Sequence, residues 1–196
     1  MENNQQYFFN SQIHLYLVYK INYFIDMKAT ILTSIMLMIS SLVIGQVSSQ
    51  EAIKKLDFLL GEWEGQAKAV TGPGQVQELH QFESVELRMG EKMLFMEGKG
   101  YQENEMVFNA VGLVTFDEGK QEYEMQSWLA TGEKTKAYFK EKGDKFFEWG
   151  FELPNGKIRY FIKLDEKGRW SESGEFSPNG EVWYPSFEML LSKIEK

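Results

Sequence analysis

Hydrophobic and polar residues alternate along most of the chain after residue 61, with the period of two that is typical of a β-strand buried on one face. In residues 62–69, Trp63 and the small residues that follow it share one face, while Glu62 and Glu64 begin the opposite, polar face. The sequence therefore predicts a half-buried strand here, with space beside its small residues.

The same alternation returns in a series of short stretches, joined by turns that contain glycine, for which a positive φ costs little. We expect strands at residues 76–89, 93–101, 106–116, 121–130, 134–141, 145–152, 157–164, 169–176 and 181–194. No helical pattern interrupts them, so the sequence predicts an all-β, up-and-down antiparallel sheet of about ten strands. A sheet of this length curls, and closure into a β-barrel removes its exposed edges.

Two of these stretches depart from strict alternation. In residues 76–89 the pattern changes phase near Phe82–Val85, which predicts a β-bulge. In residues 181–194, Pro185 predicts a break in the pairing. The inward residues of this last strand are then expected to be Trp183, Phe187, Met189 and Leu191.

A short helix is expected just before the first strand. Ser48 and Glu51 have the spacing of a capping box, in which each side chain bonds to the backbone N–H of the other residue. Ile53, Leu56 and Leu60 then fall near one face, and Gly61 suits the C-terminal end of the helix.

Residues 27–49 have the order of a secretory signal peptide. Lys28 comes first, an apolar run follows over residues 31–44, and small and polar residues come last. The apolar run is too short to span a bilayer comfortably. Cleavage is expected near Gly45 or Ser49, and the exported domain would then be periplasmic or secreted.

Residues 1–26 are long, aromatic and nearly uncharged for the region that precedes a signal peptide. We interpret them as an upstream extension, with translation starting at Met27. The alternative is that the apolar segment stays in place as an uncleaved anchor. In both cases the working domain is about residues 50–196, and no membrane contact beyond export is expected.

Composition excludes several classes of function. The formal net charge of −8 makes the chain repel phosphate backbones and anionic lipids, so no nucleic acid partner is predicted. The chain has no cysteine, and its two histidines, His14 and His80, argue against a multi-histidine metal site. A P-loop, a nucleophile elbow and a dinucleotide-binding turn are all missing from the sequence, so no catalytic residue is predicted.

The Gly-Glu-Trp segment at residues 61–63, with a short helix before it and a meander of strands after it, resembles the calycin superfamily of lipocalins, fatty-acid-binding proteins and nitrobindins. Residues 116–128 and 158–191 are similar to exported bacterial calycin-type proteins of unknown function. The resemblance implies that Trp63 plugs one end of the barrel and packs, with Gly61 beside it, against a basic residue of the last strand. Lys193 is the nearest match to that residue, where an arginine would be expected.

The resemblance to nitrobindins would also imply haem, held by a histidine near the C-terminal end of the chain. No histidine follows His80 here, and the matching region offers Trp183 and Tyr184. A tyrosinate can hold haem iron, but a structural tyrosine is the simpler interpretation. We therefore expect no cofactor and no metal.

Several side chains are candidates for contact with a ligand. The aromatic candidates, placed inward by alternation, are Tyr123, Trp149, Tyr160, Trp170 and Trp183, although core packing would explain the same pattern. Glu172 shares a face with Trp170, so its charge would point inward and could contact a hydroxyl or amine of a ligand, unless it pairs with Arg88 or Arg159. His80 is a further candidate, with a surface position as its alternative.

A barrel of about eight strands is filled by its own side chains or holds one small ligand, and a ring of about ten strands should enclose more space. The sequence therefore predicts an exported barrel that binds a small apolar or amphipathic molecule in its interior. The alternatives are a non-enzymatic structural or interaction barrel with a filled core, and a haem-binding, nitrobindin-like protein.

Overall fold

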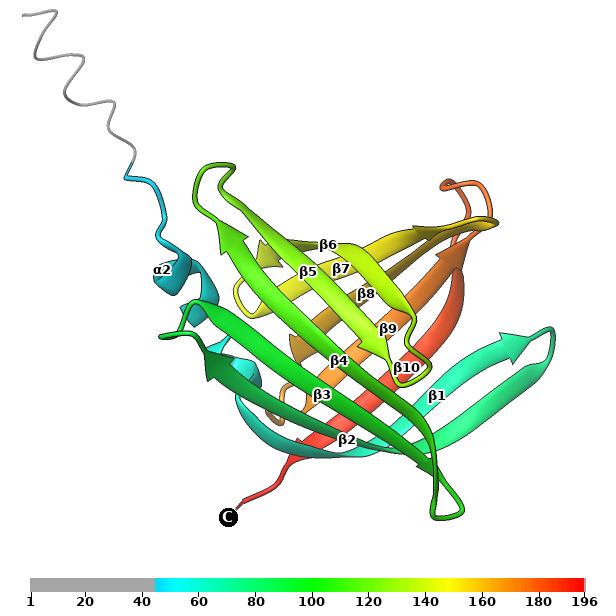
Figure 1. Cartoon of the computed structure of the whole chain (residues 1–196). Coiled ribbons are helices and arrows are strands. Elements are labelled where there is room, and N and C mark those ends of the chain that lie inside the picture. Colours follow the sequence, from blue (N-terminus) through cyan, green and yellow to red (C-terminus); the bar gives the residue numbers. More distant parts are fainter. Residues whose placement is uncertain (1–44, 196) are drawn as a thin grey trace, which may run out of the picture. The chain divides into compact units, whose positions relative to one another are not determined.

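Ten antiparallel strands close into a barrel in the computed structural model, which describes residues 45–195. The strands are β1 (Gly61–Gly72), β2 (Gln75–Arg88), β3 (Met93–Gln102), β4 (Glu105–Asp117), β5 (Glu122–Leu129), β6 (Lys134–Gly143), β7 (Phe146–Leu153), β8 (Gly156–Leu164), β9 (Trp170–Ser177) and β10 (Tyr184–Lys193). Each strand pairs with its neighbour in the chain, and β1 pairs with β10 to complete the ring (Figure 1). The prediction of an all-β, ten-stranded, up-and-down barrel is confirmed.

The expected extension at residues 1–26 lies outside the described residues, as does most of the expected signal peptide at residues 27–49. From residue 46 onward, the described chain belongs to one folding unit. Within residues 45–195, no helix combines the length and the apolar character that crossing a membrane requires.

The chain that precedes β1 lies over one end of the barrel (Figure 1). Helix α2 (Ser49–Lys54) starts with the predicted capping box, in which the Ser48 backbone N–H donates to Glu51 Oε2 at 3.0 Å. The Ser49 hydroxyl donates to Glu118 Oε1 at 2.7 Å, which fastens α2 to the turn between β4 and β5.

The helix ends sooner than predicted. Helix α2 stops at Lys54, and a separate 3-10 turn, η1 (Asp57–Leu59), carries the chain to Gly61, where a φ of 115° begins β1. Because the chain bends at Leu56 instead of continuing as one helix, Leu56 and Leu59 both turn inward, and each is 0% exposed.

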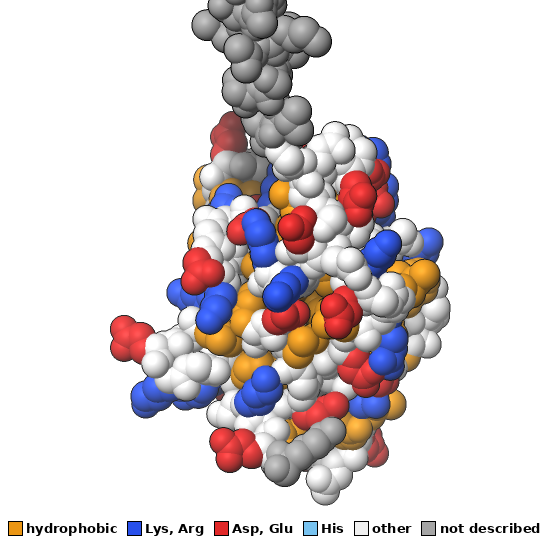
Figure 2. Space-filling view, turned by 90° about the vertical axis from the view of Figure 1, so that its left-hand side faces the viewer, with side chains coloured by type: hydrophobic (Ala, Val, Ile, Leu, Met, Phe, Trp, Pro, Cys, Tyr) orange, Lys and Arg blue, Asp and Glu red, His pale blue; other side chains and the backbone are white. Residues whose placement is uncertain are grey.

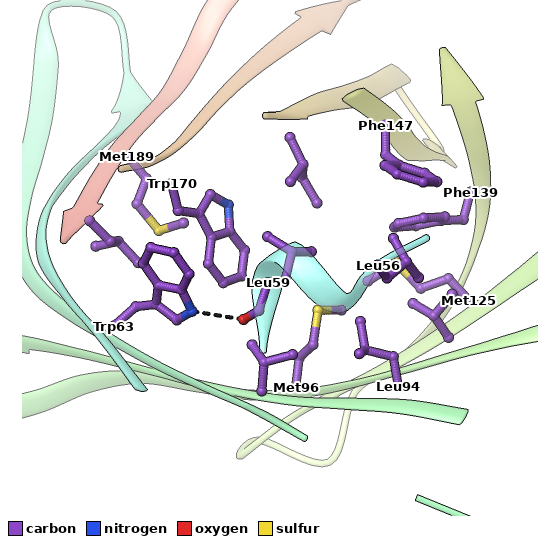
Figure 3. Packing of buried hydrophobic residues seen from close by; sticks show 14 of the residues in the cluster. Leu56, Leu59, Trp63, Leu94, Met96, Met125, Phe139, Phe147, Trp170 and Met189 are labelled. Atoms are coloured by element: carbon purple, nitrogen blue, oxygen red, sulfur yellow. Dashed lines mark hydrogen bonds between the residues drawn. The ribbon is translucent and has the colours of Figure 1, made fainter. Parts of the chain in front are cut away.

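The apolar core surrounds these two leucines. Figure 3 shows the labelled members of the cluster around Leu56 and Leu59, namely Trp63, Leu94, Met96, Met125, Phe139, Phe147, Trp170 and Met189. They come from strands all around the ring, and the chain before β1 enters this cluster through Leu56 and Leu59 and so acts as a stopper. Burial of this apolar area is the main force that stabilises the fold. We call this part of the barrel the closed end.

The opposite end carries five hairpin turns, which join β1 to β2, β3 to β4, β5 to β6, β7 to β8 and β9 to β10 (Figure 1). In the described part of the chain, no helix lies over these turns. We call the region between these turns and the apolar core the open half.

The bulge predicted at residues 82–85 is wrong, because β2 pairs continuously with both β1 and β3 over this stretch. Gln81 and Glu83 lie on the same inward face as Val85, while the Phe82 ring lies on the outward face. The apparent change of phase therefore comes from polar residues that point inward beside an aromatic residue that points outward.

The outer surface on the side that carries α2 has no dominant charge. Figure 2, which looks at that side, shows acidic and basic side chains interspersed among hydrophobic ones. Lys55 Nζ, for example, lies 2.7 Å from Glu141 Oε2, and both side chains are exposed. Exposed pairs of this kind contribute little to stability, so the fold depends mainly on the apolar core.

Candidate functional site

Trp63 and Trp170 form the floor of the open half. Their rings meet edge to face with centroids 5.9 Å apart, and each side chain is 2% exposed. Trp63 Nε1 donates to the Leu59 carbonyl at 2.7 Å (Figure 3), and Lys193 Nζ lies 5.3 Å from the Trp63 ring centroid. Gly61 leaves room for this lysine, since a Cβ there would lie 2.9 Å from Lys193 Cε. The contact that the resemblance implied for Trp63 is present, with lysine as the base.

Four rings line one side of the open half. Trp149 on β7 stacks on Tyr160 on β8, with centroids 4.1 Å apart. Phe151 lies 6.2 Å from Trp149, and Phe187 lies 5.7 Å from Tyr160. Gly174 permits this arrangement, because a Cβ there would lie 2.7 Å from Tyr160 Cε1. We call Trp149, Phe151, Tyr160 and Phe187 the aromatic wall.

Small residues line the strands across the ring from the aromatic wall. Strand β3 lies five positions from β8 in the closed ring of ten strands. The inward residues of β3 to β5 in the open half include the small residues Gly98, Ala110 and Ser127, beside the larger Leu129. Small side chains that face large rings favour space between the two sides. Beside the first strand, where space was expected, Ala67 is instead 0% exposed within the apolar core.

Solvent reaches the aromatic wall. All four rings are partly exposed, although their strands direct them to the inside of a closed ring. These rings lie toward the end of the barrel that no helix covers within residues 45–195, so solvent reaches them from that end. At the closed end, by contrast, the inward residues Phe147 and Leu191 are 0% exposed.

Glu172 lies on β9 at the base of the aromatic wall and is 7% exposed. Trp149 Nε1 donates to Glu172 Oε1 at 2.9 Å. Burial raises the pKa of Glu172 to about 7, although the indole N–H groups of Trp149 and Trp170 act in the opposite direction. The N–H of Trp170 acts on this carboxylate without completing a hydrogen bond to it, and it is buried with no other partner.

A second carboxylate, Glu83 on β2, lies on the same floor. Gln81 Nε2 donates to Glu83 Oε1 at 2.7 Å. Gly98 faces Glu83 in the pairing of β2 with β3, and a Cβ there would lie 2.6 Å from Glu83 Oε1. Burial, with smaller contributions from the charges of Glu172 and Glu97, raises the pKa of Glu83 to about 8.

Neither carboxylate has a basic partner within residues 45–195. The two arginines considered for Glu172 pair elsewhere, because Arg159 bonds to Glu175 at 2.7 Å and Arg88 pairs with Glu86. Buried acids without a counter-ion are unfavourable when they ionise. The floor therefore holds two acids that favour their neutral form and that would be stabilised as anions by a cation.

The structure brings together four of the candidates proposed from the sequence, namely Trp149, Tyr160, Trp170 and Glu172. Tyr123 belongs to the closed end, where its hydroxyl donates to the Ala52 carbonyl at 2.7 Å and its ring packs edge to face on Phe147. It therefore contributes to the stopper and not to the wall of the open half.

His80 and Trp183 lie on the outside of the barrel. His80 Nε2 is 2.8 Å from Glu64 Oε1 on the outward face of β1 and β2. Trp183 precedes β10, and the guanidinium carbon of Arg159 lies 3.9 Å from its ring centroid, on the outward face of β8. Neither residue is placed to line the interior.

The inward residues do not fit the iron of a haem. His80, the one histidine within residues 45–195, faces outward, so no histidine of this part of the chain is placed to hold haem iron inside the barrel. Within residues 45–195, no group of three or more histidine or acidic side chains is placed to hold a metal ion.

Neither a family model nor a curated protein sequence matches the chain. Among solved structures, Rv2717c from M. tuberculosis is similar over 74% of this chain and 98% of its own, with a TM-score of 0.54 and 14% sequence identity. The S-type phycobiliprotein lyase CPES from Guillardia theta is similar over 78% of this chain and 95% of its own, with a TM-score of 0.50 and 12% identity. At these identities the likeness shows the fold alone, a closed antiparallel β-barrel.

Proposed function

We propose that this protein binds a small apolar or amphipathic molecule in the open half of its barrel. The observation that carries the proposal is the partial exposure of the inward aromatic wall, which faces small residues across the ring. Rings and small residues around a closed floor, with a few polar groups, are the composition of a small-molecule site. The proposal includes no catalytic step and no cofactor.

The test is the uptake of N-phenyl-1-naphthylamine, a neutral apolar dye whose fluorescence rises in an apolar site. We expect the purified protein to bind it in saturable fashion. The variant Ser127→Phe places a ring in the open half and should lower dye affinity at least about tenfold. Gln126→Phe adds the same ring to the outward face of the same strand and should leave affinity unchanged. Equal dye binding by the two variants would exclude the interior as the site.

A second candidate function is an interaction barrel that works through its surface. The observation that favours it is a set of exposed apolar side chains near the hairpins of the open half, namely Val70, Val76, Met106, Val107, Leu153, Val182 and Tyr184. Absence of dye binding in a protein that is folded and monomeric would favour this alternative. A Soret band after addition of haem would instead revive the haem-binding alternative.

We further propose that the domain is exported after cleavage near Gly45. The support from the structure is that Ser48 caps α2 and that the Ser49 backbone N–H donates to Glu118 Oε1 at 2.7 Å. Cleavage after Ser49 would remove both contacts. The mass of the mature protein recovered from an exporting host tests this, since the two sites leave different N-termini.

A further inference from the structure

We propose that the floor of the open half binds the ammonium group of an amphipathic amine, with Glu83 and Glu172 as its carboxylate contacts. This inference rests on the proposed function, because it names the chemical class of the ligand for the same interior site. It concerns the charge of the ligand, which the dye experiment leaves open.

The first argument is the imbalance of charge on the floor. Glu172 comes from β9 and Glu83 from β2, and each carboxylate is held by a neutral donor, the Trp149 indole at 2.9 Å and the Gln81 amide at 2.7 Å. Within residues 45–195, none of the ion pairs includes either acid. A cation supplied by a ligand would provide the missing counter-charge.

The second argument is an unmade hydrogen bond. Trp170 is 2% exposed, its Nε1 has no partner, and this N–H acts on the Glu172 carboxylate. An ionised carboxylate has about four lone-pair sites, enough for the N–H groups of Trp149 and Trp170 and for an ammonium. A bound cation favours the ionised form of Glu172, which is the better acceptor for both indoles.

The third argument is the chemistry of the aromatic wall. The stacked rings of Trp149 and Tyr160 rise directly from Glu172, since the Trp149 indole bonds to that carboxylate. Ring faces attract cations and also bury apolar surface. An amine attached to an apolar body would therefore contact the carboxylates and the rings at the same time.

Binding of such an amine should release a proton. Glu83 feels the charges of Glu172 and of Glu97 from β3, and Glu172 acts on the phenol of Tyr160 from β8. The nearby base Lys193 lies over the Trp63 ring. The pKa of Glu83 is about 8 and that of Glu172 about 7, so both acids hold protons near neutral pH. An alkylammonium stays charged up to about pH 10. It binds as a cation, and the displaced carboxyl proton goes to the buffer.

The experiment compares tryptamine with indole-3-propionic acid, which has the same ring and the opposite charge, by isothermal titration calorimetry. We expect tryptamine to bind at least about tenfold more tightly at pH 7.5. Titration in two buffers with different ionisation enthalpies should show release of about one proton per amine. Tryptamine affinity should rise between about pH 6 and pH 8 as the acids ionise.

Variants locate the cation. Glu172→Gln and Glu83→Gln keep the size of the side chain and remove its charge, so each should lower tryptamine affinity about tenfold and leave the affinity for N-phenyl-1-naphthylamine unchanged. Glu64→Gln on the outward face is the matched control and should change neither affinity. Thermal melts of all three variants establish that they are folded.

Equal affinity for tryptamine and indole-3-propionic acid would overturn the inference, as would full tryptamine affinity in both interior variants. If the neutral dye binds and the amine shows no preference, the proposed function stands and only the charge of the ligand is wrong. If neither the dye nor the amine binds, both the proposed function and the inference about the amine fail.

Discussion

The closed end and the open half are built from the same ten strands and are filled in opposite ways. At the closed end, Trp63 and Trp170 pack with Leu56 and Leu59, and all four side chains are buried. In the open half, large rings face small residues, and two carboxylates lie on the floor without a basic partner in the described chain. The first arrangement stabilises the fold, and the second lowers stability and resembles a binding site.

This contrast indicates that one end of the barrel stabilises the fold and that the other is suited to binding. Stability comes from the end where the chain before β1 enters the ring, so the other end can keep partly exposed rings and buried acids. Binding sites commonly tolerate such unfavourable features because the rest of the fold compensates for them. Substitutions in the two regions should therefore have different effects on stability and on ligand binding.

The largest expected difference is between two tryptophans. Trp63→Ala removes a buried ring from the closed end and should lower the free energy of unfolding by about 3–5 kcal/mol. Trp149→Ala removes a partly exposed ring from the open half and should cost less than half of that, while abolishing dye binding. Urea unfolding and dye titration of both variants measure the contrast. Similar losses of stability in the two variants would mean that the closed end and the open half contribute equally to the free energy of unfolding.

The next effect is a dependence of stability on pH that comes from the floor of the open half. In the folded state the pKa of Glu83 is about 8 and that of Glu172 about 7, both above the ordinary value of 4.5. Between pH 4.5 and about pH 8, these two side chains hold more protons in the folded state than in the unfolded state. The contribution of these groups to the free energy of unfolding is therefore complete at low pH and falls as the pH rises from about 5 to 8.

The variant Glu83→Gln removes the acid with the higher pKa. We expect it to raise the free energy of unfolding by about 2–4 kcal/mol at pH 8.5 and to change it little at pH 5. Denaturant unfolding at the two pH values provides the measurement, with Glu64→Gln as the control on the outer face. A gain of equal size at both pH values would show that the variant acts through packing and not through ionisation.

The smallest expected effect is a loss of stability at the N-terminal cap of α2, at the closed end of the barrel. Ser48→Ala removes the side chain that accepts from the Glu51 backbone N–H at 3.3 Å and should cost about 1 kcal/mol of stability. Dye affinity should not change, because α2 lies at the far end of the barrel from the aromatic wall. Ser173→Ala, at an exposed position of β9, is the control. Loss of dye binding in Ser48→Ala would contradict the separation of the two regions.

Most of the fold could be predicted from the sequence because most strands are short, alternate with a period of two and end at a turn with glycine. The turn between β3 and β4 is an exception, since Glu103 and Asn104 adopt the positive φ there. The register break at Pro185 was predictable because proline has no N–H to donate to the sheet, and the pairing of β10 with β9 shifts between Pro185 and Phe187. The break after Lys54 was not, because the apolar spacing of Leu56 and Leu60 fits one continuous helix as well as a helix followed by a 3-10 turn.

Of the two acids on the floor, only Glu172 was predicted from the sequence, and there is a physical reason why Glu83 was not. Glu172 was found because it stands between Trp170 and Gly174 in a clear alternation. Glu83 was not found, because a charged residue at an inward position looks like a shift of phase when the neighbouring Phe82 is aromatic. Strict alternation from Leu79 onward would have placed Glu83 inside the barrel.

The pairing of β1 with β10 has a consequence for how the chain matures. Trp63 lies opposite Lys193 in that pairing, so the seam joins the first strand of the domain to its last. Until the final residues emerge from the ribosome, the first strand has no permanent neighbour on that side. Folds dominated by such distant contacts assemble slowly, on the order of milliseconds to seconds. Loss of the final strand would leave β1 and β9 as two unpaired edges, each open to pairing with another chain.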